Sequence, residues 1–89
     1  MKTDFRKSFA RDLRRRKNDS VFLDCVKKVI EEVELSEITT EITNLKKLKG
    51  ETDYYRIRFG NYRIGIKIED DLVVFIRALH RKDIYRYFP

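Results

Sequence analysis

Apolar residues in the first half of the chain recur at the spacing of an α-helix. Phe9 and Leu13 are four residues apart and Phe5 lies one turn earlier, which predicts a first helix with a narrow apolar stripe and a strongly basic opposite side. A longer run follows the same repeat at Val21, Phe22, Cys25, Val26, Val29, Ile30 and Val33. The Asn-Asp-Ser sequence at residues 18–20 is typical of a segment that ends one helix and caps the next. The first half therefore predicts two antiparallel helices joined by a short polar turn.

The second half of the chain has the alternating pattern of β-strands. Residues 54–59 alternate large apolar residues with arginines, and residues 62–68 place an aromatic residue and three isoleucines on one face. Gly60 and Asn61 indicate a tight turn between these segments, and the acidic residues 69–71 indicate another. Residues 72–79 form a nearly continuous apolar run, as in a central strand that is covered on both faces.

The remaining segments have weaker patterns. Residues 1–5 are consistent with an edge strand, residues 35–49 indicate a short helix, a loop and a basic turn, and residues 80–89 form a basic tail. The predicted fold class is α+β, with the two N-terminal helices packed on one face of a small, twisted, mainly antiparallel sheet of three or four strands. A length of 89 residues fits a single domain, residues 1–89.

The charge balance favours a polyanionic partner. A net charge of +6 and a pI near 9.6 attract RNA, DNA, an acidic protein or an anionic membrane, and charge alone does not choose among them. Cys25 is the single cysteine, which excludes an internal disulfide and a cysteine-based zinc site. The first residues lack the apolar segment of a secretory signal, and no apolar run approaches the roughly 20 residues of a membrane span. We therefore expect a cytoplasmic protein that makes no use of a membrane.

Arginines on the predicted strands should share one face of the sheet. If Ile57 and its apolar neighbours face the helices, Arg56 and Arg58 face the other way, and Arg63 joins them from the next strand. Guanidinium groups bind phosphate oxygens, and aromatic rings stack on the bases of single-stranded RNA. One such arginine is most simply a solvent-exposed strand residue, but three on one face beside a basic, aromatic tail favour phosphate binding. The residues that we expect to bind RNA are Arg56, Arg58, Lys47, Lys49, Lys82 and Arg86.

Two side chains near the end of the chain are candidates for proton transfer. His80 is the only histidine, and imidazole titrates near neutral pH, although a lone histidine is more often structural. Tyr85 is suited to stack on a base or deliver a proton, or alternatively to pack at the sheet edge. The three acidic residues at 69–71 fit a turn better than a metal site, and there is no glycine-rich phosphate loop. We expect no metal and no cofactor.

Three segments together resemble the RelE/ParE superfamily of toxins from type II toxin–antitoxin systems. They are the Lys-Leu-Lys-Gly sequence at residues 47–50, residues 54–64 and residues 80–86, and they are closer to the RelE ribonuclease branch than to the ParE branch. The resemblance implies a fold of two helices on a small antiparallel sheet. It also implies metal-free cleavage of mRNA in the ribosomal A site, in which a ribose 2′-hydroxyl attacks the adjacent phosphate and the 5′-oxygen leaves.

The same resemblance implies roles for individual residues. Arg63 and Arg81 would bind the scissile phosphate and stabilise its transition-state charge, Tyr85 would stack on or orient the nucleotide, and His80 would transfer a proton. Arg56 and Arg58 stand where the family often has lysines. Because an arginine stays protonated in a protein, a lysine that serves as the base in relatives has no equivalent here, and this chain would use His80 or Tyr85 instead or be slower.

The resemblance further implies a set of partners. These are a cognate acidic antitoxin, mRNA and the ribosome, with operator DNA bound only through the antitoxin and no membrane. Two alternatives stay open: a ParE-like inhibitor of DNA gyrase without catalysis, and a catalytically inert RNA-binding relative.

Overall fold

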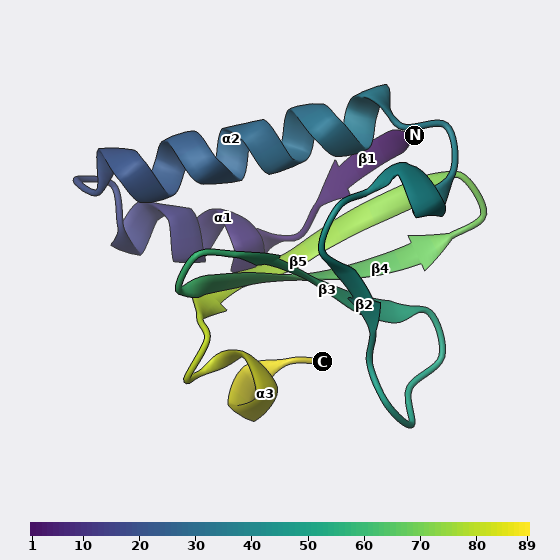
Figure 1. Ribbon diagram of the computed structural model, residues 1–89. Coiled ribbons are helices and arrows are strands. Elements are labelled where there is room, and N and C mark those ends of the chain that lie inside the picture. The colour runs from purple at the N-terminus through teal and green to yellow at the C-terminus, as the bar shows by residue number, and fades with distance from the viewer.

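The computed structural model describes residues 1–89 as three helices, a 3-10 turn and one five-stranded sheet (Figure 1). The helices are α1 (Lys7–Arg15), α2 (Ser20–Leu35) and α3 (Ile84–Tyr87), with the 3-10 turn η1 at Thr39–Glu41. The strands are β1 (Lys2–Phe5), β2 (Leu45–Lys47), β3 (Tyr54–Phe59), β4 (Tyr62–Glu69) and β5 (Leu72–His80). The strand order is β1-β5-β4-β3-β2, in which only the β1–β5 pair is parallel. The predicted α+β class is confirmed.

Both predicted N-terminal helices are present and lie on one face of the sheet (Figure 1). Asp19 caps the start of α2, because its carboxylate accepts a hydrogen bond from the backbone N–H of Phe22 at 3.0 Å. The main core lies between these helices and the sheet. The helices contribute Phe9, Phe22, Val26 and Val33, and strands β3, β4 and β5 contribute Ile57, Ile64, Ile66, Val73 and Phe75. None of the helices is both long and apolar enough to cross a membrane.

The prediction of three or four strands was wrong, because the sheet has five. The expected edge strand at the N-terminus is β1, and the extra strand is β2, which lies within the segment predicted to be a loop and a basic turn. Leu45 lies opposite Ile57 and Lys46 opposite Arg56, so this strand is held by pairing with β3. Lysines are typical of an exposed sheet edge, where they hinder pairing with other chains.

The segment predicted as a basic tail folds back onto the sheet. Its single helical turn, α3, lies on the face opposite α1 and α2 (Figure 1). Ile84 and Phe88 are buried there with Leu48, in a second small core that Tyr54, Ile76 and Leu79 border. The apolar run of β5 is consequently covered on both faces, as its composition predicted.

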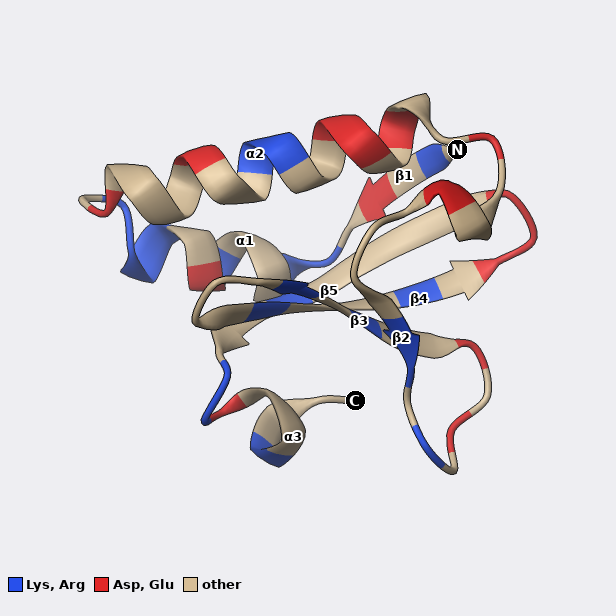
Figure 2. Cartoon of the chain, in the orientation of Figure 1, with Lys and Arg blue, Asp and Glu red and all other residues tan.

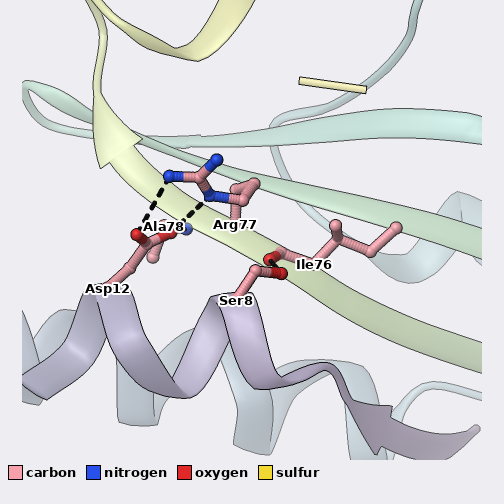
Figure 3. A network of polar contacts seen from close by, with 5 residues as sticks. All are labelled: Ser8, Asp12, Ile76, Arg77 and Ala78. Carbon is pink, nitrogen blue, oxygen red and sulfur yellow. Dashed lines mark hydrogen bonds and ion pairs between the residues drawn. The ribbon is translucent and has the colours of Figure 1, made fainter. Parts of the chain in front are cut away.

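The α1 helix completes the edge of β5 beyond the end of β1 (Figure 3). The Ser8 hydroxyl donates to the carbonyl of Ile76 at 2.6 Å, and Asp12 accepts from the N–H of Ala78 at 3.0 Å. The same carboxylate, almost fully buried, accepts from Nε and Nη2 of Arg77 at 2.8 and 3.1 Å. These bonds satisfy backbone groups that an edge strand would otherwise leave unpaired.

Candidate nucleic-acid interface

Three arginines of β3 and β4 point away from α1 and α2. Arg58 lies directly opposite Arg63 in the strand pairing, and Arg56 lies opposite Gly65. Lys46 on β2 lies opposite Arg56 and so shares this face. Figure 2 shows basic residues on the adjoining strands β2, β3 and β4. Like charges placed directly across a sheet repel each other, so this arrangement opposes folding stability and suits a bound anion.

The electrostatics of Arg63 show that the cationic groups lie close together. Burial lowers the pKa of Arg63 below its ordinary value, and the charges of Arg56 and Arg58 lower it further. The charge of Arg81 acts in the same direction, whereas the Tyr85 phenol opposes it. We call Arg56, Arg58, Arg63 and Arg81 the arginine cluster. The two ion pairs of the molecule, Lys67–Glu69 and Arg77–Asp12, lie outside it, so the charge of the cluster is not neutralised.

Hydrogen bonds hold the guanidinium of Arg63 and leave some of its N–H donors without a partner. Nη1 of Arg63 donates to the carbonyls of Gly60 and Tyr62, both at 2.9 Å, while its Nε and Nη2 have no partner in the protein. The side chain of the exposed Arg58 has none either. Free, oriented guanidinium donors are the groups that bind phosphate oxygens.

Tyr85 adjoins the arginine cluster from α3. Nε of Arg56 donates to the Tyr85 hydroxyl at 3.2 Å, and Nη1 of Arg56 donates to the carbonyl of Asn44 at the same distance. The Tyr85 side chain is 63% exposed. The cluster therefore has beside it an accessible ring that can stack on a base and a hydroxyl that can exchange a proton.

His80 lies apart from this group. It is the last residue of β5 and lies opposite Tyr62, whose ring packs against Phe22 of α2. The imidazole meets the Tyr62 ring edge-on at 5.7 Å, and its Nδ1 accepts from the N–H of Lys82 at 3.2 Å. Because neighbours along a strand point to opposite faces, His80 faces the helices while Leu79 pairs with Arg63. The structure does not bring His80 together with Arg63 and Tyr85.

The other predicted RNA-binding residues lie around the cluster rather than in it. Lys47 lies opposite Tyr55, on the helix-facing side, and Lys49 lies in the turn after β2. Lys82 is exposed, and the guanidinium of Arg86 lies 5.5 Å from the centre of the Tyr87 ring. The sequence pattern does not assign Lys46 to the arginine side, because a loop has no defined faces. Pairing with β3 is what assigns Lys46 to the arginine side.

Inorganic phosphate is expected to raise the melting temperature of the protein. A bound anion would relieve the repulsion between Arg58 and Arg63, and a ligand that binds only the folded state stabilises it. About 1 kcal/mol would raise the Tm of a chain of this size by roughly 4–8 °C. The measurement is thermal unfolding at constant ionic strength with chloride or phosphate. The increment should be absent in Arg63→Ala and retained in Arg11→Ala, which removes an exposed arginine of α1. An equal increment in all three proteins would contradict a specific site.

Comparisons with known proteins place the whole chain beside toxins of toxin–antitoxin systems. A family described as the ParE toxin of the type II toxin–antitoxin system, parDE, matches residues 4–85. The toxin RelE3 of Methanocaldococcus jannaschii is 44% identical over 95 residues, covering 100% of both chains. The toxin–antitoxin complex RelB-RelE from Methanococcus jannaschii matches with a TM-score of 0.79 at 43% identity, over 97% of this chain and 99% of that one. The intact E. coli RelBE complex matches with a TM-score of 0.57 at 27% identity, over 89% and 99%.

Proposed function

This chain belongs to the ParE toxin family of type II toxin–antitoxin systems and is a toxin of the RelE type, and from that premise we propose that it is a ribosome-dependent endoribonuclease that cleaves mRNA. The observation that carries the proposal is the arginine cluster: four guanidinium groups without an acidic partner, beside an accessible tyrosine hydroxyl. A protein that acts by binding gyrase has no evident need for such a concentration of free phosphate-binding groups around one tyrosine.

The proposed reaction is attack of a ribose 2′-hydroxyl on the adjacent phosphate. It yields a 2′,3′-cyclic phosphate on one fragment and a free 5′-hydroxyl on the other. Negative charge grows on the phosphoryl oxygens in the transition state, and we assign its stabilisation to Arg63 and Arg81. The free Nε and Nη2 donors of Arg63 are available for this purpose.

Tyr85 is the group of the cluster that we assign to proton transfer and to orientation of the nucleotide. The arginines stay protonated, and His80 faces the other side of the sheet. The hydrogen bond from Arg56 holds the Tyr85 hydroxyl beside the arginine cluster. The exposed ring stacks on a neighbouring base.

The proposal includes two classes of partner. One is the ribosome with its mRNA. The arginine cluster lies on the surface of the sheet, where an mRNA strand that the ribosome holds can reach it. The other is a cognate antitoxin, since the solved relatives include complexes of RelB with RelE. We expect it to be acidic and to screen the arginine cluster, with operator DNA bound only by the antitoxin.

Replacing Arg81 tests the function in cells. Induction of the wild-type chain should arrest growth, and mapping of transcript 5′ ends should show cuts in phase with codons in translated mRNA. Arg81→Ala should restore growth and remove the cuts, because a phosphate-binding charge is lost from an exposed position, whereas the matched control Arg11→Ala should stay toxic. Cleavage is refuted if growth arrest persists with intact mRNA.

The match to a ParE family favours gyrase inhibition as the second candidate. The same induction experiment separates the two functions when plasmid supercoiling is measured alongside the transcripts. Supercoiling defects with uncut mRNA would identify the chain as a gyrase inhibitor, and the absence of any growth effect would identify an inert relative.

A further inference from the structure

We propose that Phe88, seated on Gly65, is a positioning residue that fixes Tyr85 beside Arg56. The inference rests on the proposed function, because it concerns how the same site acquires its geometry. It follows from three features of the molecule: the shortness of α3, the close contact between Phe88 and Gly65, and the position of Gly65 next to Arg56.

The α3 helix is too short to be stable by itself. It spans Ile84–Tyr87, a single turn, and forming one isolated helical turn is unfavourable. Ile84 and Phe88 are four residues apart and buried, while Tyr85, Arg86 and Tyr87 between them are exposed. The N–H of Phe88 donates to the carbonyl of Ile84 at 2.8 Å. The turn is therefore held by its two buried ends, and its exposed residues take their positions from these anchors.

Gly65 provides the space that Phe88 occupies. A Cβ atom on residue 65 would lie 2.7 Å from Cγ, Cδ1 and Cδ2 of the Phe88 ring, closer than real Cβ contacts. Gly65 is not among the glycines with a positive φ, so its backbone does not require glycine. The ring is 3% exposed and meets Tyr54 edge-on at 5.8 Å. Residue 65 is therefore a glycine because the Phe88 ring occupies the space of a side chain, and not because the backbone conformation requires glycine.

This contact adjoins the arginine cluster. Arg56 lies directly opposite Gly65 on the neighbouring strand, and Arg56 is the residue whose Nε holds the Tyr85 hydroxyl. A ring displaced from Gly65 moves the turn that carries Tyr85 while Arg56 stays on its strand. Misplacement of a reacting group by about 1 Å can lower a rate by about a hundredfold, so the seating of Phe88 acts on the chemical step through Tyr85.

The test combines three single variants, and the double variant of Gly65→Ala with Phe88→Ala, with two readouts. The single variants are Gly65→Ala, which pushes the ring out, Phe88→Leu, which keeps an apolar anchor without the ring, and Phe88→Ala, which empties the space. One readout is kcat and KM for cleavage of mRNA on programmed ribosomes. The other is the NMR signal of the Arg56 Nε–H, which reports its hydrogen bond to Tyr85 whether or not the protein cleaves RNA. Thermal unfolding identifies any variant that does not fold.

We expect Gly65→Ala to lower kcat by about tenfold or more, because the rate depends steeply on the position of the reacting group, and to change KM by less than about twofold. The same variant should shift the NMR signal of the Arg56 Nε–H. In the Phe88→Ala background the same alanine should have little further effect, because the nearest atoms to its Cβ are those of the absent ring. Phe88→Leu should shift the signal less than Phe88→Ala does. If Gly65→Ala does not fold, the two Phe88 variants decide the question by the same signal.

An unchanged Arg56 signal in the folded Gly65→Ala or Phe88→Ala proteins would overturn the positioning role. So would an effect of Gly65→Ala that is equally large with and without the ring. Failure of the proposed function has a different signature: the wild-type protein would not cleave mRNA, while the Arg56 signal would still respond to the variants.

Discussion

Replacing Arg63 with alanine is expected to lower the rate of mRNA cleavage by about a hundred- to a thousandfold. This is the typical loss when one preorganised donor to transition-state charge is removed. The pKa of Arg63 is lowered by its burial and by the charges of Arg56 and Arg58, so this residue lies within the arginine cluster. Its guanidinium donates hydrogen bonds to the carbonyls of Gly60 and Tyr62. The loss should fall on kcat more than on KM, because the interaction strengthens as charge develops.

The same substitution should leave the stability of the protein nearly unchanged. Two hydrogen bonds to backbone carbonyls disappear, but so does the repulsion between Arg63 and Arg58, which face each other across the sheet. Single-turnover cleavage on ribosomes and thermal unfolding together measure both effects, with Arg11→Ala as the matched control. An inactive protein whose melting temperature falls by more than about 10 °C, the equivalent of one to a few kcal/mol, would indicate a structural role for Arg63 instead.

Local sequence patterns predicted most of the fold. The helical repeat of α2, its cap at Asp19 and the Gly60-Asn61 turn depend on residues that are near one another in the chain, so the pattern contains the information. The alternation along β3 and β4 also assigned Arg56, Arg58 and Arg63 to one face. The β2 strand depends instead on pairing with a segment ten residues away, and its lysines have no apolar alternation that would reveal it.

Two parts of the site were harder to predict: the position of His80 and the helical turn α3. The sequence placed His80 just after the last strand, but it is the last residue of β5, so the alternation of side chains along the strand points it toward the helices. The sequence analysis predicted a basic tail without assigning it a helix, although Ile84 and Phe88 have the spacing of one helical turn within a polar segment. Gly65, the one residue without a side chain on the arginine-bearing face of β4, was the signal that another group packs there.

Replacing Asp12 with alanine is expected to destabilise the protein more than any substitution within the arginine cluster. Asp12 is 4% exposed and serves three donors at once: Nε and Nη2 of Arg77 and the N–H of Ala78. Its hydrogen bond raises the pKa of Arg77, against the lowering that burial causes. Removing one partner of a buried ion pair costs about 3–5 kcal/mol, and since the Arg77 side chain is 21% exposed we expect about 3 kcal/mol.

Graded substitutions separate the contributions of Asp12 in a thermal or urea unfolding series. Asp12→Asn keeps an oxygen that can accept from Ala78 but removes the charge, so it should lose less stability than Asp12→Ala. Arg77→Gln should also lose stability, because it leaves the almost fully buried Asp12 carboxylate without its cationic partner, although that carboxylate still accepts from the Ala78 N–H. Asp24→Ala on the exposed side of α2 is the matched control and should unfold like the wild type. Equal losses for Asp12→Asn and Asp12→Ala would show that the hydrogen bond to the strand edge contributes little.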